Sequence, residues 1–261
     1  MIAYIVLLLF IIGAGVLIFR KPKKAIAQPF PPHWHELLLE HVNFYRKLTP
    51  QMQAEFQRGI MKFLSEVYID GVKTELTDLD KVLIASSAVI PVFGFEEWHY
   101  NNLSGVLLYP DHFNYDLEFA DGADSRNIGG MVGSGQFENQ MILSRKALYH
   151  GFDITTDKGN TGIHEFVHLI DKMDGLVDGI PQALLPYEYA VPWLNLMHKS
   201  MEAINNDKSD IRHYGGTSQA EFFAVAAEYF FERPELLRNK HPELYTMMVA
   251  CFNPNKVSSV Q

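Results

Sequence analysis

The sequence has little cysteine and no surplus of basic residues, and each shortage excludes a class of protein. Cys251 is the single cysteine among 261 residues, so no disulfide can form within the chain. Lysine and arginine number 22 against 31 aspartates and glutamates, which gives a formal net charge of -9. A chain with this balance has no cationic field with which to displace counterions from a nucleic-acid backbone. We therefore expect no nucleic-acid partner.

The sequence also lacks internal repeats and low-complexity tracts. Hydrophobic residues make up 48% of the chain and aromatic residues 13%, which is enough for a sizeable core. These values predict one main domain with a small appendage. We place the main domain at residues 33–261, a basic and proline-rich linker at 20–32, and an apolar segment at 1–19.

Residues 1–19 contain no charged side chain, and this absence predicts a transmembrane helix. A helix of this length spans about 28 Å, close to the bilayer core of about 30 Å. Arg20, Lys21, Lys23 and Lys24 follow at once, so the positive-inside rule predicts a single-pass anchor with its N-terminus outside and the main domain in the cytoplasm. Two alternatives remain: a cleaved signal peptide, with a small-residue site at 25–27, or a buried helix.

Periodicity and turn residues predict a mostly helical α+β domain with a small sheet. Apolar residues spaced by three and four between positions 33 and 67 indicate two helices with a break near residue 48, and residues 80–91 indicate another. Residues 105–109 and 140–144 have the composition of short strands. The glycine-rich piece at 128–135 is either a hairpin connection or a mobile loop on the substrate side. After residue 160 we expect mainly helices, with a long loop at 174–192.

The stretch N-T-G-I-H-E-F-V-H-L-I-D, residues 160–171, predicts an amphipathic helix that presents two histidines. Its apolar residues fall at i, i+3, i+4 and i+7, which makes one buried stripe. His164 and His168 are one turn apart and point the same way beside this stripe, so they can bind one Zn²⁺ ion. Glu165 can then act as general base on a water at the metal. The alternative is a core helix that carries two partly exposed histidines.

A catalytic zinc site needs a third protein ligand, and residues 218–232 offer one. This segment is strongly apolar, yet Glu221 and Glu228 lie seven residues apart on one face of the predicted helix. A carboxylate on a buried helix requires a partner or a metal. We expect Glu221 to ligate zinc and Glu228 to accept a hydrogen bond from a ligand imidazole. The alternative is that both carboxylates reach solvent or pair with arginines.

An ordered set of motifs resembles a known family. These motifs are I-H-E-F-V-H-L-I-D at 163–171, D-G-L-V-D-G-I-P at 174–181, Y-G-G-T-S-Q-A-E-F-F-A-V-A-A-E-Y-F-F-E-R-P-E-L at 214–236 and H-P-E-L-Y at 241–245. Together they resemble the zinc-dependent peptidases of the Mlc titration factor A type, over roughly residues 30–255. The resemblance implies a zincin-like fold related to the catalytic domain of anthrax lethal factor.

The resemblance also implies roles for single residues. His164, His168 and Glu221 match the ligands of one zinc ion per chain, in the arrangement called gluzincin, and Glu165 matches the catalytic base. Tyr214 matches a tyrosine that stabilises the oxyanion; a buried structural tyrosine is the alternative, and His213 is another possible donor. The family implies a peptide or protein substrate, aminopeptidase-like activity and, through its founding members, a transcriptional-repressor partner.

The sequence therefore predicts a zinc metallopeptidase that hydrolyses peptide bonds through a metal-activated water. Asp171 lies on the same helix face as the histidines, where it could orient a ligand imidazole or face solvent near the helix end. The alternative function is a binding module that sequesters an Mlc-type regulator, with zinc in a structural role.

Overall fold

Four short strands form one sheet in the computed structural model, which describes residues 29–95, 97–119, 127–133, 135–185 and 187–252. The strand order is β1-β2-β4-β3, with β1, β2 and β4 parallel and β3 antiparallel at the edge beside β4. The strands are β1 (Tyr68–Gly71), β2 (Gly105–Tyr109), β3 (Gly130–Val132) and β4 (Gln140–Ser144). The predicted bounds of 105–109 and 140–144 are therefore those of β2 and β4.

Side chains alternate between two buried faces of this sheet. Val106 and Leu108 of β2 join the main core, whereas Leu107 and Tyr109 belong to a smaller apolar cluster on the other face. Phe113 and other residues of the segment after β2 cover that second face. Because both faces are covered, β2 is apolar at every position after its glycine, as parallel strands usually are.

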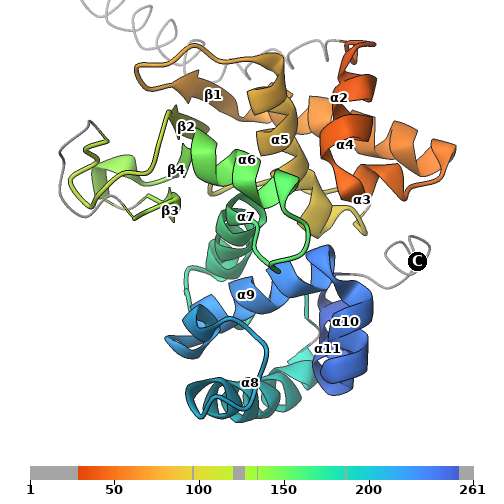
Figure 1. The fold of residues 1–261 in the computed structure, drawn as a ribbon, viewed down its shortest axis with the longest axis vertical. Helices are drawn as coiled ribbons and strands as arrows, with labels where there is room; N and C mark the ends of the chain where they lie inside the picture. The colour runs from red at the N-terminus through yellow and green to blue at the C-terminus, as the bar shows by residue number, and fades with distance from the viewer. Residues whose placement is uncertain (1–28, 96, 120–126, 134, 186, 253–261) are drawn as a thin grey trace, which may run out of the picture.

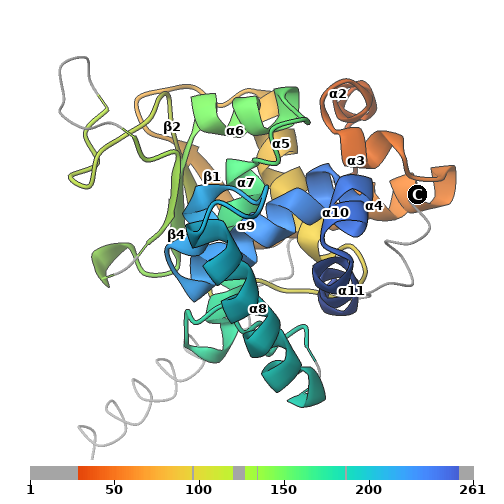
Figure 2. The same ribbon diagram turned by 60° about the horizontal axis from the view of Figure 1, so that its bottom comes forward.

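Helices cover one face of the sheet and extend away from it (Figures 1 and 2). Those before residue 160 are α2 (Trp34–His41), α3 (Asn43–Arg46), α4 (Pro50–Glu66), α5 (Asp78–Val89) and α6 (Arg145–Asp153). The predicted break near residue 48 is present, because Thr49 caps α4 and Pro50 occupies its first position. Short 3₁₀ helices are η1 (Ile90–Val92), η2 (Gly135–Phe137), η3 (Lys172–Asp174), η4 (Tyr187–Tyr189) and η5 (His213–Gly216).

The second half of the chain is helical, as the sequence predicts. Its helices are α7 (Thr161–Asp171), α8 (Ala190–Asn205), α9 (Gln219–Glu232), α10 (Pro234–Lys240) and α11 (Pro242–Cys251). Helix α7 lies between the helices on the sheet and α9 (Figure 1). It approaches α5 closely, since a Cβ atom on Gly162 would lie 2.1 Å from Ser87 Oγ. Glycine at position 162 therefore allows α7 to pack closely against α5.

The predicted membrane anchor requires a correction. The longest helix of the described residues, α4, has 17 residues, or about 25 Å of rise. Within the described ranges, no helix has both the length and the apolar character to cross a bilayer. The segment 1–19 and most of the linker lie outside the described residues. The described fold is a mostly helical α+β domain with a four-stranded sheet. The prediction of a transmembrane helix, and with it a single-pass protein whose main domain lies in the cytoplasm, is wrong for the described residues.

A buried ion pair joins the start of α5 to the start of α6. Asp80 is 0% exposed and accepts hydrogen bonds from Arg145 Nε and Nη2, both at 2.8 Å. Tyr149 donates to the same carboxylate at 3.0 Å, and Asp80 also completes a capping box with Thr77. Removing one member of a buried pair leaves the other charge uncompensated, which makes this contact a strong determinant of stability.

We expect Asp80→Ala to lower the free energy of unfolding by about 3 kcal/mol, because Arg145 loses its carboxylate partner. Asp78→Ala is the matched control on the same helix: Asp78 pairs with His33 at the surface, and its loss should cost less than about 1 kcal/mol. Urea denaturation of both variants measures the difference. Equal losses would show that the buried pair contributes no more than a surface contact.

Candidate metal centre

Helix α7 presents both predicted histidines on one side. The side chain of Asn160 caps the helix by accepting from the backbone N–H of Ile163 at 3.0 Å. The predicted apolar stripe is buried in the core, and the imidazoles of His164 and His168 emerge beside it with ring centroids 4.6 Å apart. The stripe consists of Ile163, Phe166, Val167 and Ile170. Burial of the stripe thus fixes the direction in which the histidines point.

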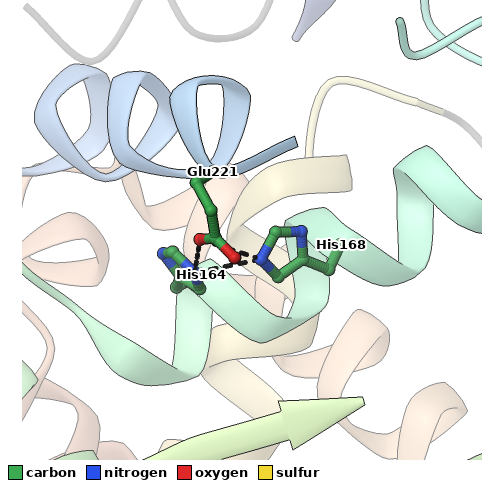
Figure 3. Close-up of side chains that lie close together, drawn as sticks. All are labelled: His164, His168 and Glu221. Atoms are coloured by element: carbon green, nitrogen blue, oxygen red, sulfur yellow. Dashed lines mark hydrogen bonds and ion pairs between the residues drawn. The ribbon is translucent and has the colours of Figure 1, made fainter. Parts of the chain in front are cut away.

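Helix α9 supplies the carboxylate that faces them. Ser218 caps this helix, which places Glu221 in its first turn, directly above α7 (Figure 3). Glu221 Oε2 lies 3.0 Å from His164 Nε2 and 3.4 Å from His168 Nε2. The two Nε2 atoms are 3.0 Å apart. Three atoms from two helices that could hold a metal ion therefore lie close together, and the assignment of Glu221 as a ligand stays a prediction.

The donor set and its spacing fit a zinc ion. Two imidazole nitrogens and one carboxylate oxygen are the ligands of many catalytic zinc sites, with metal–ligand distances of about 2.0–2.2 Å. Tetrahedral ligands at that distance are separated by about 3.3 Å from one another, and the three contacts here measure 3.0, 3.0 and 3.4 Å. Glu221 Oε2 is buried and has no hydrogen-bond partner of suitable geometry within the described residues. A metal ion would satisfy this atom.

The electrostatics of the cluster reflect its crowded charges. Burial disfavours the charged imidazole, but Glu228 and Glu221 outweigh burial and raise the pKa of His164 to about 10. Burial likewise favours the protonated form of Glu221, yet the two imidazoles hold the pKa of that carboxyl well below its usual range. Positive charge is thus strongly stabilised between these side chains. A bound metal ion would supply that charge and would hold the imidazoles in their neutral form.

Glu228 contacts the other side of His164, where we expected an acceptor. It is 1% exposed, and its Oε1 atom lies 2.7 Å from His164 Nδ1. Its other oxygen accepts from the backbone N–H of Asn160, and Arg212 donates to Oε1. The carboxylate therefore ties the start of α7, the imidazole of His164 and the loop before η5 together. From the sequence, pairing of Glu228 with an arginine was the alternative to a contact with a histidine. In the structure Glu228 makes both contacts.

Glu165 lies beneath the edge strand of the sheet. Its side chain is buried, and burial raises its carboxyl pKa. A Cβ atom on Gly130 would lie 2.6 Å from Glu165 Cγ and 2.8 Å from Oε1, so this strand position has room only for glycine. Part of the glycine-rich segment 128–135 forms strand β3, which pairs antiparallel with β4. Residues of this segment also line the cleft of the candidate site.

Tyr214 stands at the mouth of the site, and its side chain is 51% exposed rather than buried. Its ring lies 5.9 Å from that of His164. Burial of the hydroxyl end and a hydrogen bond to the carboxylate of Glu221 raise its pKa to about 12, so the phenol stays protonated. His213, the alternative donor, instead lies 2.9 Å from Asp207 in an exposed pair.

Asp171 is buried rather than exposed to solvent, but it is not bonded to a ligand histidine. Its Oδ2 atom accepts from the backbone N–H of Gly179 at 2.9 Å, and burial raises its pKa to about 6. Asp171 Oδ1 and His168 Nδ1 are both buried and without hydrogen-bond partners among the residues described. An orienting role for Asp171 therefore stays a prediction.

Sequence reasoning missed a second polar centre, at Asp210. This carboxylate accepts from Tyr229 at 2.9 Å and from Lys158 at 2.8 Å, and it lies 2.7 Å from His241 Nε2. The contacts tie the loop before Tyr214 to α9 and to the start of α11. Because the partners are far apart in sequence, no local pattern could have indicated them. Arg212 was missed for the same reason.

A cleft of about 930 Å³ opens above the three ligand atoms. Helix α7 forms its floor and β3 one wall, while Tyr115, Val177 and Tyr214 stand at other parts of its lining. Glu165 and the two histidines face this space together with Glu221. The volume is in the range of sites that enclose a ligand larger than a single amino acid.

Comparison with known proteins agrees with this geometry. Residues 18–253 match the family described as glucose-regulated metallo-peptidase M90. The chain belongs to this family. Among its relatives, the Mlc titration factor A of Escherichia fergusonii is 30% identical over 247 residues, which cover 90% of each chain. That of Pectobacterium atrosepticum is 32% identical over 180 residues, 65% of this chain and 66% of the relative.

A third relative is the uncharacterized protein slr2042 of a Synechocystis strain, 28% identical over 245 residues, or 90% of this chain and 89% of that protein. Membership of the M90 family confirms the predicted resemblance and supports a metallopeptidase domain that binds a metal ion. In this M90 domain, the residues available for the ion are His164, His168 and Glu221.

The contact between Glu228 and His164 predicts a change in metal affinity. We expect Glu228→Gln to weaken zinc binding about tenfold, because an amide supports the ligand imidazole less well than a carboxylate. Glu232→Gln, one turn further along α9, is the matched control and should leave zinc affinity unchanged. Competition with a chromophoric chelator measures both. Equal weakening in the two variants would mean that general damage to α9, rather than the His164 contact, sets affinity.

Proposed function

We propose that this M90 domain is a zinc-dependent peptidase of the gluzincin type, with one zinc ion per chain. One observation carries the proposal: three ligand atoms from α7 and α9 lie 3.0–3.4 Å apart, at the base of a cleft that Glu165 also lines. A zinc ion held there would polarise a scissile carbonyl and lower the pKa of water. The chain must then position a base, an oxyanion donor and a peptide.

Glu165 is the proposed general base. It follows a ligand histidine directly in α7, so its carboxylate reaches the same cleft without being needed as a ligand. Burial raises the pKa of its carboxyl, which makes the carboxylate a better proton acceptor. It would take a proton from the attacking water and pass this proton to the leaving amine.

Tyr214 is the proposed donor to the oxyanion. Its ring faces His164 at the mouth of the cleft, and its pKa of about 12 keeps the hydroxyl proton in place. A donor fixed beside the reacting carbonyl stabilises the charge that develops on oxygen in the transition state. Asp210, through its contacts with α9 and α11, holds the loop from which this tyrosine extends.

The wall of the cleft supports an extended peptide as the substrate. Among the described strands, β3 is the last of the sheet, so its outer edge could form backbone hydrogen bonds with an added strand. Glycine at position 130 lets this strand pass directly over Glu165. A peptide paired with β3 would cross the cleft beside the base. The proposal includes aminopeptidase-like activity, which the family resemblance implies.

A second candidate function comes from the names of the relatives. Two of the three relatives described above are called Mlc titration factor A, which favours a regulator-binding module that captures an Mlc-type repressor. In that function zinc would hold α7 and α9 together and would not take part in hydrolysis. The two functions differ in what they require of Glu165, which is not one of the three residues grouped as possible metal ligands.

Glu165→Gln should abolish peptide hydrolysis while the protein still folds and binds zinc, because the amide cannot accept a proton. A rate loss of at least about 10³-fold is expected for removal of the base. Glu188→Gln, at an exposed position, is the control and should keep full activity. Peptides with free and with acetylated N-termini, assayed in parallel, test the aminopeptidase part.

Full hydrolysis by the Glu165→Gln variant would remove this residue from the mechanism. If the zinc-loaded wild type hydrolyses no peptide of a broad library but binds an Mlc-type repressor, the binding function is the correct one. The peptidase proposal also fails if the purified protein takes up no zinc.

Tyr214→Phe should lower kcat about 100-fold with little change in KM, because the hydroxyl acts mainly on the transition state. Tyr115→Phe is the matched control, since Tyr115 lines the same cleft with its side chain 88% exposed. Steady-state kinetics on one peptide separates kcat from KM. An increase confined to KM would instead assign Tyr214 to substrate binding.

A further inference from the structure

A second cavity, of about 300 Å³, shares no lining residue with the metal cleft. Its lining comes from α4, from the end of α5 with η1, and from Phe93, Phe95, Trp98 and Tyr100. Its volume falls at the lower end of the range for small-molecule sites. The cavity is therefore large enough for a compact ligand and too small for a folded partner.

Aromatic rings form the walls of this cavity. Phe95 and Trp98 lie 5.2 Å apart between ring centroids, and Trp98 lies 6.1 Å from Tyr100. Val89 and Val92 contribute aliphatic surface, and the complete aromatic set is Phe63, Phe93, Phe95, Trp98 and Tyr100. Rings arranged in this way favour an apolar ligand body, above all a planar one.

Three side chains that donate hydrogen bonds line the cavity. Arg58 and Lys62 are one turn apart on α4, and neither forms an ion pair within the part of the chain that the structure describes. The indole N–H of Trp98 is buried and has no partner among the described residues. Each of these groups donates hydrogen bonds and accepts none. Leaving the buried indole N–H of Trp98 unpaired is costly, so a ligand at this point should offer an acceptor. Arg58 is exposed and Lys62 half-buried, so they can reach an acceptor at the rim.

The two acids of the lining, Glu55 and Glu66, each have a partner. Glu66 lies 2.9 Å from His99 Nδ1, and Glu55 has an interaction partner of its own. Arg58 and Lys62 form no ion pair within the described ranges, whereas both acids have partners. This difference favours an anionic head over an ammonium group, although aromatic walls alone would suit the latter.

We propose that this cavity is a binding site for a small carboxylate with an aromatic body. The ring lies between Phe63 and the rings of Phe95 and Trp98, and the carboxylate faces Arg58 and Lys62. The cavity also contacts the helix of the metal centre indirectly: the rings of Phe63 and Tyr100 lie 5.5 and 5.2 Å from that of Phe166 in α7. The site does not depend on peptidase activity, and binding alone tests it.

Three probes with the same ring and different heads test the proposal on the full chain: 3-phenylpropionate, 3-phenylpropanamide and 3-phenylpropylamine. The indole N–H signals of Trp34, Trp98 and Trp193 are followed by NMR during each titration, with the Trp98 signal assigned from Trp98→Phe. We expect the propionate to shift the Trp98 signal, while Trp193, whose N–H bonds Gly179 O at 2.6 Å, stays unchanged. The propionate should bind about tenfold more tightly than the amide.

Arg58→Gln and Lys62→Gln should each weaken 3-phenylpropionate binding about threefold, and the double variant about tenfold, without changing the affinity for the amide. Arg46→Gln and Lys208→Gln make the same charge changes at exposed positions outside the cavity and should have no effect. The proposal is overturned if no probe binds, if binding leaves the Trp98 signal unmoved, if the amine binds best, or if the two rim variants behave like the controls.

Discussion

The contact between His164 Nδ1 and Glu228, at 2.7 Å, joins the two helices on which all three candidate ligands lie. Glu228 is almost completely buried, and a buried carboxylate must be compensated by hydrogen bonds or charge. It obtains them from the start of α7 through the N–H of Asn160, from the ligand imidazole, and from Arg212 in the preceding loop. One buried charge thereby fixes α7, α9 and the loop of Tyr214 relative to one another.

Local periodicity explains why so much of this centre could be predicted from the sequence. The stripe of α7 has only one orientation that buries it, and that orientation turns His164 and His168 outward together. On α9, carboxylates at 221 and 228 interrupt an otherwise apolar helix, and the structure brings both to His164, on opposite edges of its ring. The patterns of α7 and α9, each considered alone, therefore predicted that the two helices meet. Each pattern contains a polar side chain that needs a partner once it is buried.

Features that depend on loops could not be predicted in this way. Arg212 and Asp210 find their partners across long sequence separations, and no spacing rule indicates such contacts. Gly130 was placed in a connection, because the position of β3 over Glu165 follows from pairing with β4 and not from its own composition. The expected anchor at 1–19 followed from hydropathy alone, and the described helices contain no membrane-spanning segment.

Charge balance within the centre also favours a metal ion over protons. The carboxylates of Glu165, Glu221 and Glu228 meet here, and Arg212 offsets one of their charges. Glu228 first, and then Glu221 and Glu165, outweigh burial and raise the pKa of His164 to about 10. Protonating both imidazoles would bring two donors face to face across the 3.0 Å between their Nε2 atoms, with mutual repulsion. A divalent cation between the three candidate ligand atoms would supply the same charge without that repulsion, so the buried carboxylates that hold α7 and α9 together also favour a metal ion at this point.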